Sequence, residues 1–285
     1  MKSNNWFPRS WMALVYAFLY TPILIMIVFS FNKGRPTQWR GFSLENYELL
    51  FKTPEIASSL WVSLKIALLA ASLSVIIGTL IAFVLNRYRR FPGKTLFGGM
   101  ASTPLVMPEV VLGLSLLLVF KSLFKLEGGY LTIILGHTLL GAAYATVVIR
   151  ARFSEIPAAY EEAALDLGAK PLNAFFLVIL PLIAQSLMSA WLLVFTISFD
   201  DVVISQFLSG PGVKPLPNVI LDNARQGAKP ILNALGAMIV FVVSAALIAG
   251  SIYLQKREKR IAKEIAAAYR DALFLSDVKK RPSQQ

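Results

Sequence analysis

Six long apolar runs divide the chain, and charges, Gly or Pro fill the segments between them. A helix that crosses a bilayer needs about 20 mostly apolar residues, because each residue adds about 1.5 Å against a hydrocarbon core of about 30 Å. Six runs meet this length. They are residues 11–31, 60–85, 96–120, 131–149, 182–208 and 232–254. The pattern therefore predicts an all-α polytopic membrane protein with six transmembrane helices.

Composition supports this class and excludes others. Hydrophobic residues make up 56% of the 285 residues, against about 45–50% in soluble domains. The chain has no Cys and one His, which excludes disulfide frameworks, thiol sites and His-rich metal sites. A net charge of +12 would suggest nucleic acid in a soluble chain, but a bilayer explains it better. The first run is too long for a signal-peptide core, so we expect a retained span.

The distribution of Lys and Arg predicts the orientation. If the N-terminus is inside, 18 of the 28 basic residues fall in inside segments and nine fall in outside loops. Positive charge is enriched on the cytoplasmic side of membrane proteins. We therefore expect both termini in the cytoplasm (N-in/C-in). We also expect one transmembrane domain over residues 1–285, with core spans at 11–254, a cytoplasmic loop at about 155–181 and a basic tail, 255–285, that continues the last helix.

The segment "EEAALDLGAKPLNAFFLVILP", residues 161–181, is acidic and helix-forming, although it lies between two apolar runs. Ten residues, "AAYEEAALDL", predict a helix of about 15 Å, which is too short to span a bilayer. Pro157 suits the first turn of this helix, Gly168 suits the position after its end, and Pro171 can begin the next helix. By these features alone the segment is either a rigid contact for a soluble partner or an amphipathic connector on the membrane.

A family resemblance favours the first interpretation. The segment resembles the signature loop of ABC importer permeases, in which E-A-A, three residues, G, nine residues and I-x-L-P follow in order. The matching residues are Glu162, Ala163, Ala164, Gly168, Leu180 and Pro181, with Val178 in place of the usual Ile. The resemblance implies the type I ABC importer permease fold. It also implies that this helix is the coupling helix, which docks on a cytoplasmic ATPase through Glu162, Ala163, Ala164 and Gly168.

Three carboxylates fall inside the apolar runs, where ionisable groups are costly and often functional. Glu109 follows Pro104 and Pro108, which should break the third run, so Glu109 would lie in the first turn of a new half-helix. Asp200 and Asp201 are adjacent in the fifth run and would point about 100° apart on a helix. We expect the three to line a path for a cation. Alternatively, Glu109 only stabilises its helix, and one aspartate caps a helix or pairs with a partner subunit.

Other polar residues in the runs have less specific interpretations. His137 is more typical of a hydrogen-bonded core histidine than of a ligand. Thr196, Ser198 and Ser205 could give the path a wet polar lining.

The resemblance extends to a particular subfamily. "LYTPILIMIVFSFN", "PLVMPEVVLGLSLLLVF", "AALDLGA" and "FTISFDDVVISQFLSGPG" together are similar to permeases of polyamine (putrescine/spermidine) ABC importers, over residues 19–254. Glu109 stands where that subfamily usually has Asp. The resemblance implies alternating access in the bacterial inner membrane, a second permease subunit, two ATPase subunits and an extracytoplasmic polyamine-binding protein. ATP and Mg²⁺ would bind the ATPase, and this chain would need no cofactor.

Three alternatives remain open from the sequence. The same fold could carry another solute, such as thiamine, a metal chelate or an oligosaccharide. The chain could be a channel or scaffold that needs no ATP. It could be an intramembrane enzyme, although the sequence indicates no nucleophile–base pair or ligand set. The "GKT" at 93–95 is not a phosphate loop, because Tyr88 stands where that motif needs Gly.

Overall fold

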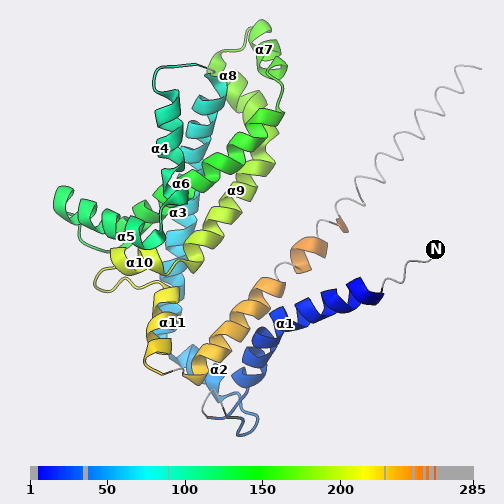
Figure 1. Cartoon of the computed structure of the whole chain (residues 1–285), viewed down its shortest axis with the longest axis vertical. Coiled ribbons are helices and arrows are strands. Elements are labelled where there is room, and N and C mark those ends of the chain that lie inside the picture. Colours follow the sequence, from blue (N-terminus) through cyan, green and yellow to red (C-terminus); the bar gives the residue numbers. More distant parts are fainter. Residues whose placement is uncertain are drawn as a thin grey trace, which may run out of the picture. The chain divides into compact units, whose positions relative to one another are not determined.

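A computed structural model describes residues 6–34, 38–88, 90–227, 229–245, 248–252, 255, 256 and 260 (Figure 1). The chain forms two compact units. The first is drawn from Met1–Leu50 and Lys229–Gln285, and the second is Phe51–Ala228. The single domain expected from the sequence stays a prediction.

The first unit contains α1 (Trp6–Ser30), most of α2 (Glu45–Lys52) and an apolar helical segment, Pro230–Ile252. The buried Asn46 of α2 fixes the chain after α1. Its Nδ2 donates to the backbone carbonyls of Ser30 and Asn32, each at 3.0 Å. The tail expected to continue the last helix lies mostly outside the described residues.

The core of the second unit is formed by α3 (Pro54–Arg87), α6 (Tyr130–Glu155) and α9 (Leu180–Asp200). Small residues let α3 and α6 approach closely, as is common between membrane helices. A Cβ atom added to Gly78 of α3 would lie 2.7 Å from the Cβ of Ala145 and 2.9 Å from the amide nitrogen of Thr146. Ile149 and Ile183 are fully buried where α6 and α9 meet in this core.

The third apolar run is broken, as the prolines predict. It forms α4 (Lys94–Val106) and then α5 (Glu109–Leu118) with the π-helical turn η1 (Val119–Leu123), and the two parts are bent by 111°. The break lies at Met107, whose backbone is extended, and at Pro108. Run 96–120 is therefore a bent pair of helices and not a straight span.

The fifth run also differs from its prediction. The short helix α7 (Ala159–Asp166) is present, and Pro157 lies just before it rather than in its first turn. From Pro171 the chain is helical through α8 (Pro171–Ala174), η2 (Phe175–Ile179) and α9, and this helix ends at Asp200. The expected run 182–208 is wrong at both ends, because α10 (Val203–Leu208) is a separate helix. It is followed by α11 (Leu216–Arg225).

The described residues include five helices that are long and apolar enough to cross a membrane. The number becomes six if α4 and α5–η1 count as one bent span. The sequence-based count of six thus depends on the bent pair, and the N-in/C-in orientation stays a prediction.

Candidate functional site

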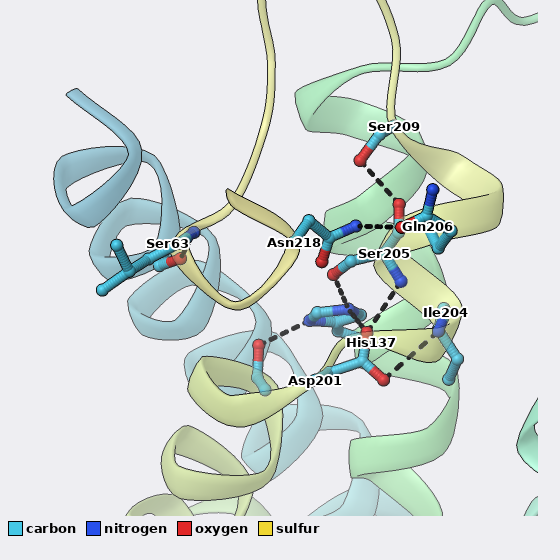
Figure 2. Close-up of polar contacts among 10 residues, drawn as sticks. Ser63, His137, Asp201, Ile204, Ser205, Gln206, Ser209 and Asn218 are labelled. Atoms are coloured by element: carbon cyan, nitrogen blue, oxygen red, sulfur yellow. Dashed lines mark hydrogen bonds and ion pairs between the residues drawn. The ribbon is translucent and has the colours of Figure 1, made fainter. Parts of the chain in front are cut away.

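A buried polar cluster lies where α9 ends and α10 begins (Figure 2). His137 of α6 is at its centre and is 4% exposed. Its Nδ1 lies 2.7 Å from Oγ of Ser198, and its Nε2 lies 3.0 Å from Oδ2 of Asp201 and 3.1 Å from Oγ of Ser205. The prediction of a hydrogen-bonded core histidine is confirmed. Ser198 and Ser205 belong to this cluster, so the structure gives them internal partners instead of the expected wet lining.

Asp201 also caps α10. The backbone N–H of Ser205 donates to its Oδ2 at 2.7 Å, and the N–H of Ile204 donates to its Oδ1 at 3.3 Å. The first amides of a helix have no partner within the helix, and a carboxylate in front of them satisfies two of them here. Because α9 ends at Asp200 and Asp201 has extended backbone, the carboxylate is free to turn toward α10.

Ser198, His137 and Asp201 are the residue types of a hydrolytic triad, but the arrangement cannot act as one. A nucleophilic Ser must reach its substrate. Ser198 is buried, and the cavity beside this cluster is about 10 Å³, room for at most about one water. The cluster therefore holds three helices together. The described residues also contain no group of three or more His, Cys, Asp or Glu side chains that could hold a metal ion.

The polar cluster continues from α10 to α11 and α3. Nδ2 of the buried Asn218 donates to Oε1 of Gln206 at 3.3 Å, and the amide of Leu216 donates to Oγ of Ser63 at 2.8 Å (Figure 2). Ser63 is in the first third of α3. A set of polar contacts thus joins α3, α11, α10 and α6 at one end of the second unit.

The other two predicted carboxylates are exposed. Asp200 is the last residue of α9, next to Asp201, but its side chain makes no hydrogen bond or ion pair with the described residues. Glu109 is exposed at the first position of α5, as expected from the two prolines. The structure therefore brings Asp201 together with His137, and no hydrogen bond or ion pair in the described part of the chain joins Glu109 to either aspartate. Both exposed carboxylates keep their oxygens available for a cationic group.

The segment with the E-A-A pattern is an exposed helix with a fixed end. Helix α7 has no buried side chain. At its end, the N–H of Gly168 donates to the carbonyl of Leu165 at 2.9 Å and that of Ala169 donates to the carbonyl of Ala164 at 3.0 Å. This pair of bonds is the Schellman motif, and it needs a left-handed residue. Gly168 supplies it with φ +84°. The predicted helix and glycine bend are confirmed.

One ion pair joins α7 to α3. Nε of Arg87, the last residue of α3, lies 3.1 Å from Oε1 of Glu161. A cavity of about 470 Å³ lies beside this pair, lined by Phe83, Asn86, Phe153, Ser154 and Glu162 among others. Glu162, which the family resemblance singles out, is exposed, whereas the carboxylate of its neighbour Glu161 is 16% exposed and points at α3. Sequence reasoning missed this pair, because only the fold brings residues 87 and 161 together.

Comparison with protein families decides the class of this protein. The family described as the inner membrane component of binding-protein-dependent transport systems matches residues 74–263, more than half of the chain. The chain belongs to this family. It is a multi-pass permease of the bacterial inner membrane and not an enzyme.

Two curated relatives of this permease match along nearly their whole length. The putrescine transport system permease protein PotI of Escherichia coli (strain K12) is 41% identical over 263 residues, covering 90% of this chain and 94% of the relative. The spermidine/putrescine transport system permease protein PotC of Haemophilus influenzae is 40% identical over 241 residues, covering 84% and 93%.

Solved structures agree on the fold of the permease. A chain of a bacterial alginate ABC transporter, in complex with an alginate-bound periplasmic protein, has a TM-score of 0.67 at 16% identity, covering 86% of this chain and 92% of that chain. A chain of the MetNI methionine ABC transporter has a TM-score of 0.55 at 14% identity, covering 74% and 95%. These likenesses confirm the ABC importer permease fold that the sequence predicts.

Proposed function

We propose that this chain is a permease subunit of an ATP-driven importer that moves putrescine- or spermidine-like cations across the inner membrane by alternating access. The observation that carries the proposal is the 41% identity with the putrescine permease PotI over 90% of the chain. The alternative solutes considered from the sequence, thiamine, a metal chelate and an oligosaccharide, have no such support.

The substrate path runs past Glu109, Asp200 and Asp201. A polyamine carries ammonium groups along a flexible chain, and a carboxylate binds such a group through a charge-assisted hydrogen bond. Glu109 and Asp200 are exposed, so their oxygens can receive successive ammonium groups. Asp201 supports the path indirectly and does not bind the solute, because its carboxylate is engaged by His137 and by the amides of α10. Few direct contacts suit a transporter, since a site must also release its solute.

Partner subunits would bind and hydrolyse the ATP that drives transport. The complex would contain a second permease, two cytoplasmic ATPase subunits that hold ATP and Mg²⁺, and an extracytoplasmic polyamine-binding protein. Helix α7 would be the coupling helix, with Glu162, Ala163 and Ala164 toward the ATPase and Gly168 at the bend. The lack of buried side chains in α7 supports this role, because its exposed residues, Glu162 and Ala163 among them, offer surface to a partner. This assignment places α7 and both termini in the cytoplasm.

The test is solute-stimulated ATP hydrolysis. The chain is reconstituted in lipid with the ATPase, second permease and binding protein of its importer, and the ATPase rate is measured with putrescine, spermidine, ornithine, thiamine and maltose. We expect stimulation by putrescine or spermidine alone. Glu109→Gln and Asp200→Asn should lower polyamine-stimulated hydrolysis and transport while the unstimulated rate stays. Glu162→Ala should remove stimulation by any solute.

Glu155→Gln is the matched control for these variants. Glu155 is the last residue of α6 and pairs with Arg152 on the same helix, so it lies outside both the acidic path and α7. Its loss should leave stimulation unchanged. Stimulation by thiamine or maltose, with no effect of Asp200→Asn, would remove the polyamine assignment and leave the importer fold. Normal stimulation of the Glu162→Ala complex would refute the role of α7.

A further inference from the structure

The last turns of α3 contact the chain before α7, α7 itself and the chain after it. Phe83, Asn86 and Arg87 are spaced i, i+3 and i+4, so they lie on one face of α3. Phe83 packs edge-to-face on Phe153 of α6 and on Phe175 of η2, with ring centroids 6.1 Å and 5.1 Å apart. Nδ2 of Asn86 donates to the carbonyl of Phe153 at 3.4 Å. One face of α3 therefore contacts the chain both before and after α7.

The contact with α7 itself is the Arg87–Glu161 ion pair. Among the described residues, no other side-chain hydrogen bond or ion pair joins α7 to another helix. Apolar packing supplements the pair only on the side of η2, where the half-buried Leu165 lines a cavity with Phe175, because no side chain of α7 is fully buried and the 470 Å³ cavity lies beside Glu161. The position of α7 relative to α3 thus depends on this pair and on the chain at both ends of α7.

At its other end, α3 is linked through α11 and α10 to Asp201. Ser63 of α3 accepts a hydrogen bond from the first residue of α11, and Asn218 of α11 donates to Gln206 of α10. The amides at the start of α10 hold Asp201. Between its ends α3 is in close contact with α6, with Ser74 Oγ donating to the carbonyl of Thr138 at 3.2 Å. A continuous α-helix of 34 residues is a stiff element of about 50 Å.

We propose that Arg87 and Glu161 are positioning residues that fix α7 to α3, so that a displacement of α7 is carried along α3 to the α10–α11 end of the same unit. The proposal rests on the proposed function, in which α7 is the helix that an ATPase moves. It gives the two neighbouring glutamates separate tasks. Glu162 faces the ATPase, and Glu161 holds the helix to the permease.

The first test is the coupling of hydrolysis to solute in the complete reconstituted complex. Arg87→Gln, Glu161→Gln and the double variant should assemble and keep the unstimulated ATPase rate. Their stimulation by loaded binding protein should fall by about 2-fold to 30-fold, the range of measured coupling effects of single residues. The two single losses should not add, because both remove the same contact. The charge-swapped variant Arg87→Glu with Glu161→Arg should regain part of the stimulation, which a merely structural role of either residue would not predict.

Glu155→Gln is again the matched control. It removes a carboxylate from an ion pair near the same end of the unit, but that pair lies within one helix. Stimulation should stay at the wild-type level. Wild-type stimulation in Arg87→Gln and Glu161→Gln would overturn the proposal, and so would additive losses with no recovery in the swapped variant.

The second test needs no solute. Because the chain has no Cys, two cysteines introduced at Leu80 of α3 and Asp166 of α7 can be spin-labelled specifically. Both residues are exposed. The distance distribution between the labels should be narrow with the ion pair present and broader in the Arg87→Gln, Glu161→Gln double variant. Equal widths would overturn the proposal. If no polyamine stimulates the wild-type complex, the proposed function fails, and the label distances still decide whether the pair holds α7.

Discussion

His137 and Asp201, 64 residues apart in the chain, meet in the second unit with Nε2 3.0 Å from Oδ2. The same carboxylate accepts the amide of Ser205 at 2.7 Å, so one side chain joins α6 to the start of α10. Asp200 beside it makes no such contact. The two neighbouring aspartates therefore differ in role, because Asp201 joins two helices and Asp200 is exposed without such a contact. This difference can be measured as a difference in the stability of their variants.

Asp201→Ala should destabilise the protein, whereas Asp200→Ala should not. Loss of the Asp201 carboxylate leaves two amides of α10 without their partner and leaves Nε2 of His137 with Ser205 alone, which costs about 1–3 kcal/mol. Loss of an exposed side chain without contacts changes stability by less than about 0.5 kcal/mol. Thermal unfolding of the purified complex in detergent measures both. Equal melting temperatures of the two variants would contradict the cap.

Gly168→Ala should loosen the end of α7. The site is open, with no atom within 4 Å of an added Cβ, so the cost comes from the left-handed backbone alone, about 1–2 kcal/mol. Asn tolerates this conformation better than Ala, so Gly168→Asn should have a smaller effect. Hydrogen exchange of the amides of Gly168 and Ala169 should speed up by about 5-fold to 30-fold in the Ala variant. Unchanged exchange would show that the bend does not need glycine.

Gly78→Ala should disturb the contact of α3 and α6. The added methyl would overlap with the Cβ of Ala145 and the backbone of Thr146, and backbone cannot move aside as a side chain tip can. Overpacking of this kind costs about 1–3 kcal/mol. The melting temperature of the complex is the measurement. Gly99→Ala in α4 is the control, since an added Cβ there meets no atom within 4 Å and Ala favours helix. A variant at position 78 as stable as the one at 99 would rule out the tight contact.

Pro108→Ala should reduce the bend between α4 and α5. Proline disfavours helical backbone in the residue before it, and Met107 is extended here. With Ala at position 108 the helix can continue, which would move Glu109. Spin labels at Met100 of α4 and Leu114 of α5 should move apart, and polyamine transport should fall. Pro104→Ala should keep the label distance, because Pro104 lies inside α4 and away from the break.

Local features of the chain were predictable where a single residue type decides the backbone. The prolines at 104 and 108 predicted the break before Glu109, and Gly168 predicted the end of α7. The end of the fifth span was not predictable from hydropathy. Residues 203–208 are as apolar as α9, and the turn at Asp201 depends on a carboxylate that caps the next helix.

The partners of the charged residues were harder to predict from the sequence. Hydropathy marks Asp200 and Asp201 alike, and only the fold places His137 beside one of them. The Arg87–Glu161 pair joins the end of α3 to an acidic helix 74 residues further along the chain. Pairings between distant segments depend on how the helices pack. This packing cannot be deduced from the residue pattern of a single sequence.

The bend between α4 and α5 limits where lipid can touch the chain. The first intrahelical bond of α5 runs from Leu112 to Pro108, so the amides of Glu109, Val110 and Val111 have no partner within the helix. The last backbone carbonyls of α4 likewise have no hydrogen-bond partner within their helix. Hydrocarbon offers no hydrogen bonds, and backbone groups left unsatisfied in it cost several kcal/mol each. The junction must therefore be covered by water or by another protein chain, and this requirement keeps the turn between α4 and α5 away from the acyl chains.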